Sequence, residues 1–190
     1  MSHLTTKRAR AHDWATIPNA ITLVRLALVI PVAILIVNRS QHVLAVVLLI
    51  VFGASDWVDG YLARKLGQSS RTGAVLDPIA DRMGVAVIAL ALVVAGQLAI
   101  WVVLGIAAVD VTLAVTYLIV RPSHAPGVSW IGKIRTAVLM AGIVLVGLGA
   151  IPELDQLGLA GQALCIIGAA LHLVAGIGYC SSIVRGPREA

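Results

Sequence analysis

Six apolar segments follow one another along the chain, and each is long enough to cross a membrane as a helix. Such a helix needs about 20 mostly apolar residues. Apolar residues make up 59% of the 190 residues and charged residues only 12%, unlike the usual balance of a soluble domain. The predicted spans are residues 17–37, 43–66, 73–96, 98–120, 131–150 and 157–184. The sequence therefore predicts an all-α integral membrane protein with one domain, residues 1–190, and six transmembrane helices.

Basic residues are concentrated at one end of these predicted spans. Eleven lysines and arginines flank the span ends on one side, whereas only Arg39 flanks them on the other. Because short cytosolic loops carry the excess of Lys and Arg, both termini are expected in the cytosol, with residues 1–15 as a juxtamembrane segment. The connection around residues 96–97 then faces outward. The basic residues form no continuous patch, so anionic lipid and phosphate are the expected partners and nucleic acid is not.

Four aspartates interrupt the second and third predicted spans. Asp56 and Asp59 are three residues apart, and Asp77 and Asp81 are four apart, so each pair lies on one helix face beside very small residues. Both helices join at residues 67–72, which places the carboxylates at comparable depths, about 6–15 Å from that loop. Carboxylates this deep oppose insertion into lipid unless they are protonated, solvated or bound to cations.

Divalent metal is the simplest partner for these carboxylates. Mg²⁺ or Mn²⁺ accepts carboxylate oxygens, and two ions bridging phosphate oxygens would stabilise charge in a phosphoryl displacement. Arg64 is placed for contact with phosphate. The alternative is that the aspartates end a helix and form salt bridges with Arg64, Arg71 or Arg82. Salt bridges alone leave the matched depths and the small residues unexplained.

The aspartates belong to a longer motif with eight fixed residues, Asp56-x2-Asp59-Gly60-x2-Ala63-Arg64-x8-Gly73-x3-Asp77-x3-Asp81. At every defined position it resembles the signature of the CDP-alcohol phosphatidyltransferase family. The resemblance implies that Asp56, Asp59, Asp77 and Asp81 are metal ligands and that Asp81 is the catalytic base on the acceptor hydroxyl. It implies a CDP pocket formed by Asp56, Asp59, Gly60, Ala63, Arg64, Gly73 and Asp77. The implied reaction transfers a phosphatidyl group from CDP-diacylglycerol to an alcohol and releases CMP.

Basic residues outside the motif bear on the acceptor. Arg25 lies inside the first span, aligned with Asn19 and Thr22 at three-residue spacing, in a segment similar to the bacterial phosphatidylglycerophosphate synthase and cardiolipin synthase branch. Lys133 and Arg135 open the fifth span in a segment similar to one in phosphatidylglycerophosphate synthases. We expect these three cations to bind an acceptor phosphate, most simply that of glycerol 3-phosphate. The alternatives are that Arg25 only pairs with an aspartate for packing and that the other two are membrane anchors.

Other functions stay open at this point. Phosphatidylglycerol, as in cardiolipin synthesis, and inositol phosphate are alternative acceptors. A divalent-cation transporter also places acids in the membrane, and a structural protein that joins helices through metal is a further possibility. The acids nevertheless gather near one face, and only Asp110 and a few hydroxyl groups lie beyond them. This distribution favours an enzyme at the cytosolic face, and the family resemblance implies that the membrane is a bacterial cytoplasmic membrane.

The sequence also predicts the surroundings of a few residues outside the motif. Asp110, in the fourth span, is expected to pair with a neighbouring helix or with water, and His124 and His172 are interpreted as satisfied polar residues. Small-residue faces that include Gly84 and Gly105 are expected to be exposed and to permit close helix packing between subunits. The family resemblance implies a homodimer.

Overall fold

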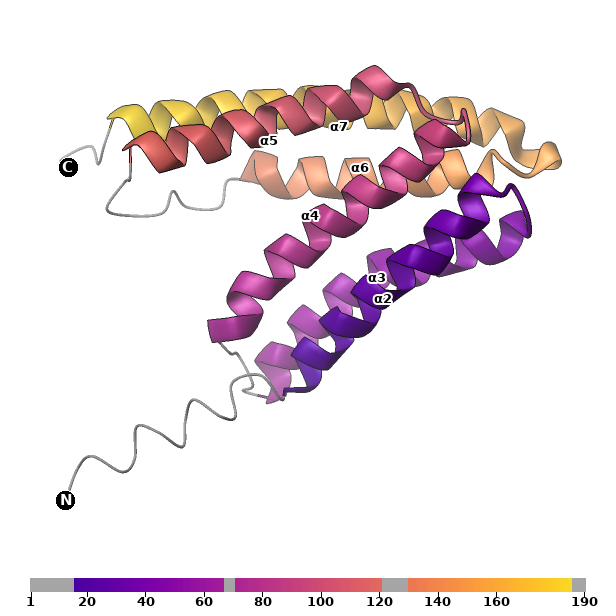
Figure 1. Cartoon of the computed structure of the whole chain (residues 1–190), viewed down its shortest axis with the longest axis horizontal. Helices are drawn as coiled ribbons and strands as arrows, with labels where there is room; N and C mark the ends of the chain where they lie inside the picture. Colours follow the sequence, from indigo (N-terminus) through magenta and orange to yellow (C-terminus); the bar gives the residue numbers. More distant parts are fainter. Residues whose placement is uncertain (1–15, 67–70, 121–129, 186–190) are drawn as a thin grey trace. The chain divides into compact units, whose positions relative to one another are not determined.

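The computed structural model describes residues 16–66, 71–120 and 130–185, which form six α-helices and one short 3-10 turn (Figure 1). No strand occurs among these residues, so the all-α class is confirmed. The ends of all six helices agree with the predicted spans to within two residues, and a 3-10 turn precedes the last helix. The elements are α2 (Ile17–Val37), α3 (His42–Leu66), α4 (Arg71–Val94), α5 (Ile100–Val120), α6 (Trp130–Leu148), η1 (Pro152–Leu154) and α7 (Asp155–Arg185).

Several of the described helices have the length and composition of membrane spans. Three qualify outright, over Asn19–Val37, Ile100–Val120 and Pro152–Ile183, and shorter apolar segments cover His42–Ser55 and Ile134–Leu148. Large apolar side chains are exposed along these helices, as expected where lipid surrounds a protein. The chain is therefore built as a multi-pass helical membrane protein.

The helices group into two compact units, residues 1–95 and residues 96–190. In the first unit α2 packs against both α3 and α4, and Figure 1 shows α2 and α3 side by side. Apolar side chains from all three helices are buried at the centre of this unit. They include Val29 and Val32 from α2, Leu49 and Phe52 from α3, and Ile88 and Leu92 from α4.

Gly84 lets α4 pack closely against the Phe52 side chain of α3 and the Val29 side chain of α2. A Cβ atom at Gly84 would lie 2.5 Å from Cζ of Phe52 and 3.3 Å from Cγ2 of Val29. Gly84 is therefore buried inside the first unit, and the prediction that it lies on an exposed face for subunit packing is wrong. Gly105 in α5 is exposed, and a Cβ atom there would have nothing within 4 Å. The sequence does not distinguish the two glycines because both helices are apolar on most faces.

The short connection between α2 and α3 is joined to the end of α4. Arg39 and Gln41 adopt positive φ angles of 49° and 52° in this connection. The Arg39 guanidinium donates a hydrogen bond from Nη2 to the carbonyl oxygen of Ala95, directly after α4. The connection at residues 38–41 and the Val94 end of α4 therefore lie at the same end of the first unit.

In the second unit α7 packs against both α6 and α5 (Figure 1). Glycines bring α6 and α7 close together, because small residues let two helix backbones approach. A Cβ atom at Gly142 would lie 2.9 Å from the backbone nitrogen of Cys165, and one at Gly158 would lie 3.2 Å from Cα of Gly149. Gln162 Nε2 also donates to the carbonyl oxygen of Gln97, at 3.2 Å.

Candidate active site

The structure places the motif on two consecutive helices of the first unit. Its first five fixed residues lie in the second half of α3, and its last three lie in the first half of α4. Among the four aspartates, only Asp81 has a side chain in the described part of the structure. The remaining motif residues are placed by their helices alone, and their side chains lie outside the described part: Asp56, Asp59, Gly60, Ala63, Arg64, Gly73 and Asp77.

The helix backbones bring the four aspartates to matching heights. At 1.5 Å per residue, Asp56 and Asp59 lie about 21 and 26 Å along α3 from its start at the α2–α3 connection. From the Val94 end of α4, which lies at the same end of the unit, Asp81 and Asp77 lie about 20 and 26 Å away. Asp56 and Asp81 thus lie at one height, and Asp59 and Asp77 lie at a second height about one helix turn away. Their roles as ligands stay predictions.

A buried polar stripe on α2 lies at these same levels. Asn19, Thr22 and Arg25 follow one another at three-residue spacing, and each is at most 2% exposed. From the Val37 end of α2 they lie about 27, 22 and 18 Å away, which matches the heights of the aspartates. Polar and charged groups are buried in a membrane helix only where other polar groups meet them. The interior of the first unit is therefore polar at the motif end and apolar at the other.

The polar stripe begins at a capped helix end. Thr16 is the N-cap of α2, and its side-chain oxygen accepts a hydrogen bond from the Asn19 backbone N–H, at 3.3 Å. A proline also stands in the first turn, where its missing N–H costs no helix bond. This local structure fixes where α2 begins and so sets the height of Arg25.

Asp81 lies half-buried on α4, beside the fully buried Ala80 and the exposed Arg82. The Asp81 side chain is therefore neither fully buried in the core nor fully exposed on the helix surface. This intermediate burial suits a group that must meet a substrate.

The two other predicted acceptor-binding cations belong to the second unit. Arg135 lies in the second turn of α6 and is half-buried, and Lys133 lies one turn earlier in the helix than Thr136. The Lys133 side chain lies outside the described part of the structure. Arg25 therefore lies at the height of the motif in the first unit. The position of Arg135 is described only within the second unit.

A contact between a histidine and an aspartate, which the sequence did not reveal, joins two helices of the second unit. His172 Nε2 in α7 lies 3.3 Å from Asp110 Oδ1 in α5, with the histidine side chain 3% exposed and the aspartate 33% exposed. The expectation that Asp110 pairs with a neighbouring helix is confirmed. No sequence pattern links two residues on separate helices 62 positions apart, so the partner was not predictable. His124 lies outside the described residues.

The donor set of the motif fits a divalent metal. Carboxylate oxygens are the ligands that Mg²⁺ and Mn²⁺ prefer, and four of them share two heights in the first unit. In the described part of the chain no group of three or more His, Cys, Asp or Glu side chains is placed to hold a metal ion. The side chains of Asp56, Asp59 and Asp77 are not among those described.

Comparison with known proteins identifies the family. The model of the CDP-alcohol phosphatidyltransferase family matches residues 15–174, most of the chain and all of the motif. The chain belongs to this family. The family that the motif resembles is thus confirmed, and the match extends from the capped start of α2 into the middle of α7.

Relatives within the CDP-alcohol phosphatidyltransferase family include proteins with two different names. The chain is 35% identical over 136 residues to proteins of Mycobacterium tuberculosis and Mycobacterium bovis that carry the provisional name cardiolipin synthase. That match covers 70% of this chain and 65% of the mycobacterial proteins. The chain is also 35% identical over 177 residues to CDP-diacylglycerol–glycerol-3-phosphate 3-phosphatidyltransferase of Escherichia coli, covering 87% of this chain and 93% of that enzyme.

Proposed function

We propose that this protein transfers a phosphatidyl group from CDP-diacylglycerol to glycerol 3-phosphate and releases CMP. The observation that carries the proposal is the common height of the aspartates on α3 and α4 and of buried Arg25 on α2. A buried cation at the height of four aspartates suits an acceptor that carries its own phosphate. The Escherichia coli relative, named for this acceptor, aligns with nearly its whole length.

Divalent metal is part of this proposal. The family generally depends on divalent metal, and Asp56, Asp59, Asp77 and Asp81 would hold two ions, Mg²⁺ or Mn²⁺. When bound, the metal supplies positive charge that stabilises the charge developing on the phosphate oxygens. The seven motif residues from Asp56 to Asp77 would line the CDP pocket, with Arg64 against the pyrophosphate.

Residues of the chain itself would remove the proton from the acceptor hydroxyl and bind the acceptor phosphate. The hydroxyl oxygen of the acceptor attacks the phosphorus that bears the diacylglycerol, and the bond from this phosphorus to the bridging oxygen of CMP breaks. The proton of the hydroxyl passes to the Asp81 carboxylate, which is half-buried on α4 and so within reach of a substrate. Arg25, with Lys133 and Arg135, would hold the acceptor phosphate and orient the hydroxyl. No covalent enzyme intermediate is needed.

We propose further that residues 1–190 form one domain with six membrane-crossing helices and both termini in the cytosol of a bacterium. The active site then faces the cytosol, where glycerol 3-phosphate is dissolved. A homodimer in the cytoplasmic membrane completes the proposal. Ser2→Cys and Gln97→Cys, each in a chain that also carries Cys165→Ala and Cys180→Ala, are treated with a cysteine-reactive, membrane-impermeant probe in intact and permeabilised cells to test the orientation. Labelling of the Ser2→Cys variant in intact cells contradicts it.

A second acceptor has specific support. The mycobacterial relatives carry a cardiolipin synthase name, so phosphatidylglycerol is the alternative acceptor. Phosphatidylglycerol also presents a phosphate, and the same three cations would bind it. The match covers only 65% of those proteins, which makes the Escherichia coli relative the better guide.

One experiment separates the acceptors. The purified protein with CDP-diacylglycerol and Mg²⁺ or Mn²⁺ is given glycerol 3-phosphate, phosphatidylglycerol, inositol phosphate or serine, and the release of CMP is measured. We expect CMP with glycerol 3-phosphate and none after the metal is removed with a chelator. Release with phosphatidylglycerol alone would assign the cardiolipin reaction instead. No CMP with any acceptor rejects the enzyme proposal.

A further inference from the structure

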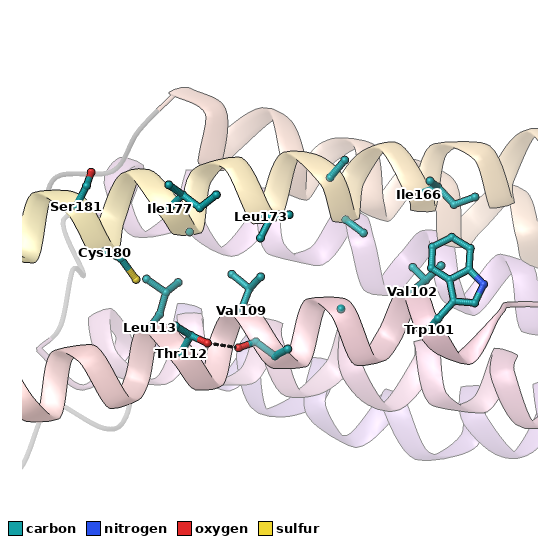
Figure 2. A pocket seen from close by; sticks show the side chains of 15 residues that line it. Trp101, Val102, Val109, Thr112, Leu113, Ile166, Leu173, Ile177, Cys180 and Ser181 are labelled. Carbon is teal, nitrogen blue, oxygen red and sulfur yellow. Dashed lines mark hydrogen bonds between the residues drawn. The ribbon is translucent and has the colours of Figure 1, made fainter.

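A long apolar groove lies between α5 and α7 in the second unit. Its volume is about 970 Å³, at the upper end of the range for small-molecule sites. Figure 2 shows Trp101 and Ile166 at one end and Leu113 and Cys180 at the other. Neither the motif nor the proposed reaction uses any residue of this groove.

The groove lies between two helices that both qualify as membrane spans. Ile100–Val120 and Pro152–Ile183 have the required length and composition, so the medium around the groove is lipid. Along α5 the lining runs from Trp101 to Leu113, a length of about 18 Å. One leaflet of the hydrocarbon core is about half of 30 Å thick. The groove therefore has the length of acyl chains from one leaflet.

The two hydroxyl residues of the lining already have hydrogen-bond partners in their own helices, and the cysteine has a partner on the facing helix. Thr112 Oγ1 donates to the Ala108 carbonyl oxygen at 2.7 Å, and Ser181 Oγ donates to that of Gly178 at 2.8 Å. The Cys180 thiol lies 3.7 Å from Thr116 Oγ1. Because these donors are satisfied, the groove presents an almost wholly apolar surface, which suits hydrocarbon better than a headgroup.

Two contacts hold the walls of the groove in place. Asp110 and His172 are in contact between α5 and α7. Gly176 lets the helices approach, because a Cβ atom there would lie 2.5 Å from Cγ1 of Val109. The space at Gly105 stays open beside these contacts, with nothing within 4 Å of a Cβ atom. The groove is thus a formed feature of the two helices.

We propose that this groove binds one phospholipid through its acyl chains, from the leaflet at the Ile100 end of α5. Trp101 is 56% exposed at that end, where aromatic rings favour the membrane interface, so the glycerol of the lipid lies near Trp101 and the chain ends lie near Cys180. In the proposed topology this is the outer leaflet.

Photo-crosslinking with a phospholipid that carries a diazirine in one acyl chain tests the proposal. The probe is incorporated into vesicles with the intact protein, and the labelled peptides are identified by mass spectrometry. A diazirine near the glycerol is expected to label the Trp101 and Ile166 end, and one near the terminal methyl the Leu113 and Cys180 end. Labelling spread evenly over exposed apolar positions, such as Leu23 and Ile30 of α2, indicates ordinary boundary lipid and overturns the proposal.

Filling the groove gives the decisive variant. Gly105→Leu places a side chain in the open space and is expected to abolish labelling of the groove peptides, and Ala108→Leu gives a second filling from the same helix. Gly178→Leu is the matched control, because a Cβ atom at Gly178 also has nothing within 4 Å and Gly178 does not line the groove. Unchanged labelling in both filling variants contradicts the proposal.

Two further experiments identify the molecule that occupies the groove. Probes with the same photoreactive chain and either a phosphocholine or a phosphoglycerol headgroup are expected to label the groove equally, since the chains make the contacts. Labelling that requires a CDP headgroup makes the groove a substrate site and overturns the proposal. A Cys180–Cys180 disulfide between two copies under mild oxidation, with buried Cys165 as the internal control, shows that a second subunit covers the groove and also overturns it.

Discussion

His172 Nε2 lies 3.3 Å from Asp110 Oδ1, which joins α7 to α5 at a point inside both membrane-spanning segments. The histidine side chain is buried and the aspartate is one-third exposed, so the pair has lost much of its water. Removing one partner of such a pair costs more than the pair contributes, because the other polar group stays in a medium of low dielectric constant.

The first prediction concerns this pair. Asp110→Ala and His172→Ala are each expected to destabilise the protein by about 1–3 kcal/mol, and the double variant by less than the sum. Thermal unfolding in detergent measures the effect, at about 2–4 °C per kcal/mol for a chain of this size. Val174→Ala, at an exposed position two residues from His172, is the control and should change little. Additive effects would show that the two side chains do not interact.

The second prediction concerns close packing at Gly84. Gly84→Ala gains up to about 1 kcal/mol in helix propensity but overpacks the Phe52 ring at a cost of about 1–3 kcal/mol, so we expect a lower melting temperature. Adding Phe52→Leu should recover part of the loss. Gly105→Ala has the same propensity gain and open space, so it should be neutral or stabilising. Equal stability of the two alanine variants would contradict the packing described here.

The third prediction concerns Arg25 as an acceptor ligand. Arg25→Ala is expected to raise KM for glycerol 3-phosphate about 10- to 100-fold, because a hydrogen bond to a charged group contributes about 1.5–3 kcal/mol. KM for CDP-diacylglycerol should change little, and Arg25→Lys should recover part of the binding. Val24→Ala, at an exposed neighbouring position, is the control. A variant that loses stability while its KM values stay unchanged would make Arg25 a packing residue.

The fourth prediction concerns Asp81. Asp81→Asn keeps the size of the side chain and removes the base, so kcat should fall about 10²- to 10⁴-fold. Binding of Mn²⁺, followed by the paramagnetic signal of the ion, should be largely preserved, because Asp56, Asp59 and Asp77 remain. The exposed neighbour Arg82 gives the control Arg82→Gln, which should keep its activity. Full activity of Asp81→Asn would exclude Asp81 as the base.

Much of the fold was predictable because hydropathy marks where a membrane helix begins and ends. The predicted span 17–37 coincides with α2, and the turn at residues 95–99 separates α4 and α5 where Gly96 and Gln97 interrupt the apolar run. The sequence does not show which helix faces meet. For that reason Gly84 was expected on an exposed face and the partner of Asp110 was unknown.

The candidate site was predictable to a different degree on each helix. The motif identifies α3 and α4 because its fixed residues repeat with helical periodicity, and the family match agrees. The polar stripe of α2 was visible as the spacing of Asn19, Thr22 and Arg25, but its burial required the structure. The place of Lys133 and Arg135 relative to that stripe depends on packing between distant segments, which no local pattern records.

The hydrogen bond from Arg39 to the Ala95 carbonyl also constrains how the protein is made. Ala95 follows Arg39 by 56 residues, so the ribosome has completed α3 and α4 before this acceptor exists. In the proposed topology the Arg39 guanidinium must already have crossed the membrane with the α2–α3 hairpin and stays solvated at the outer surface until α4 is inserted. In this topology we expect the residue that opposes the charge bias of the loops to be a docking point for the next helix during membrane insertion.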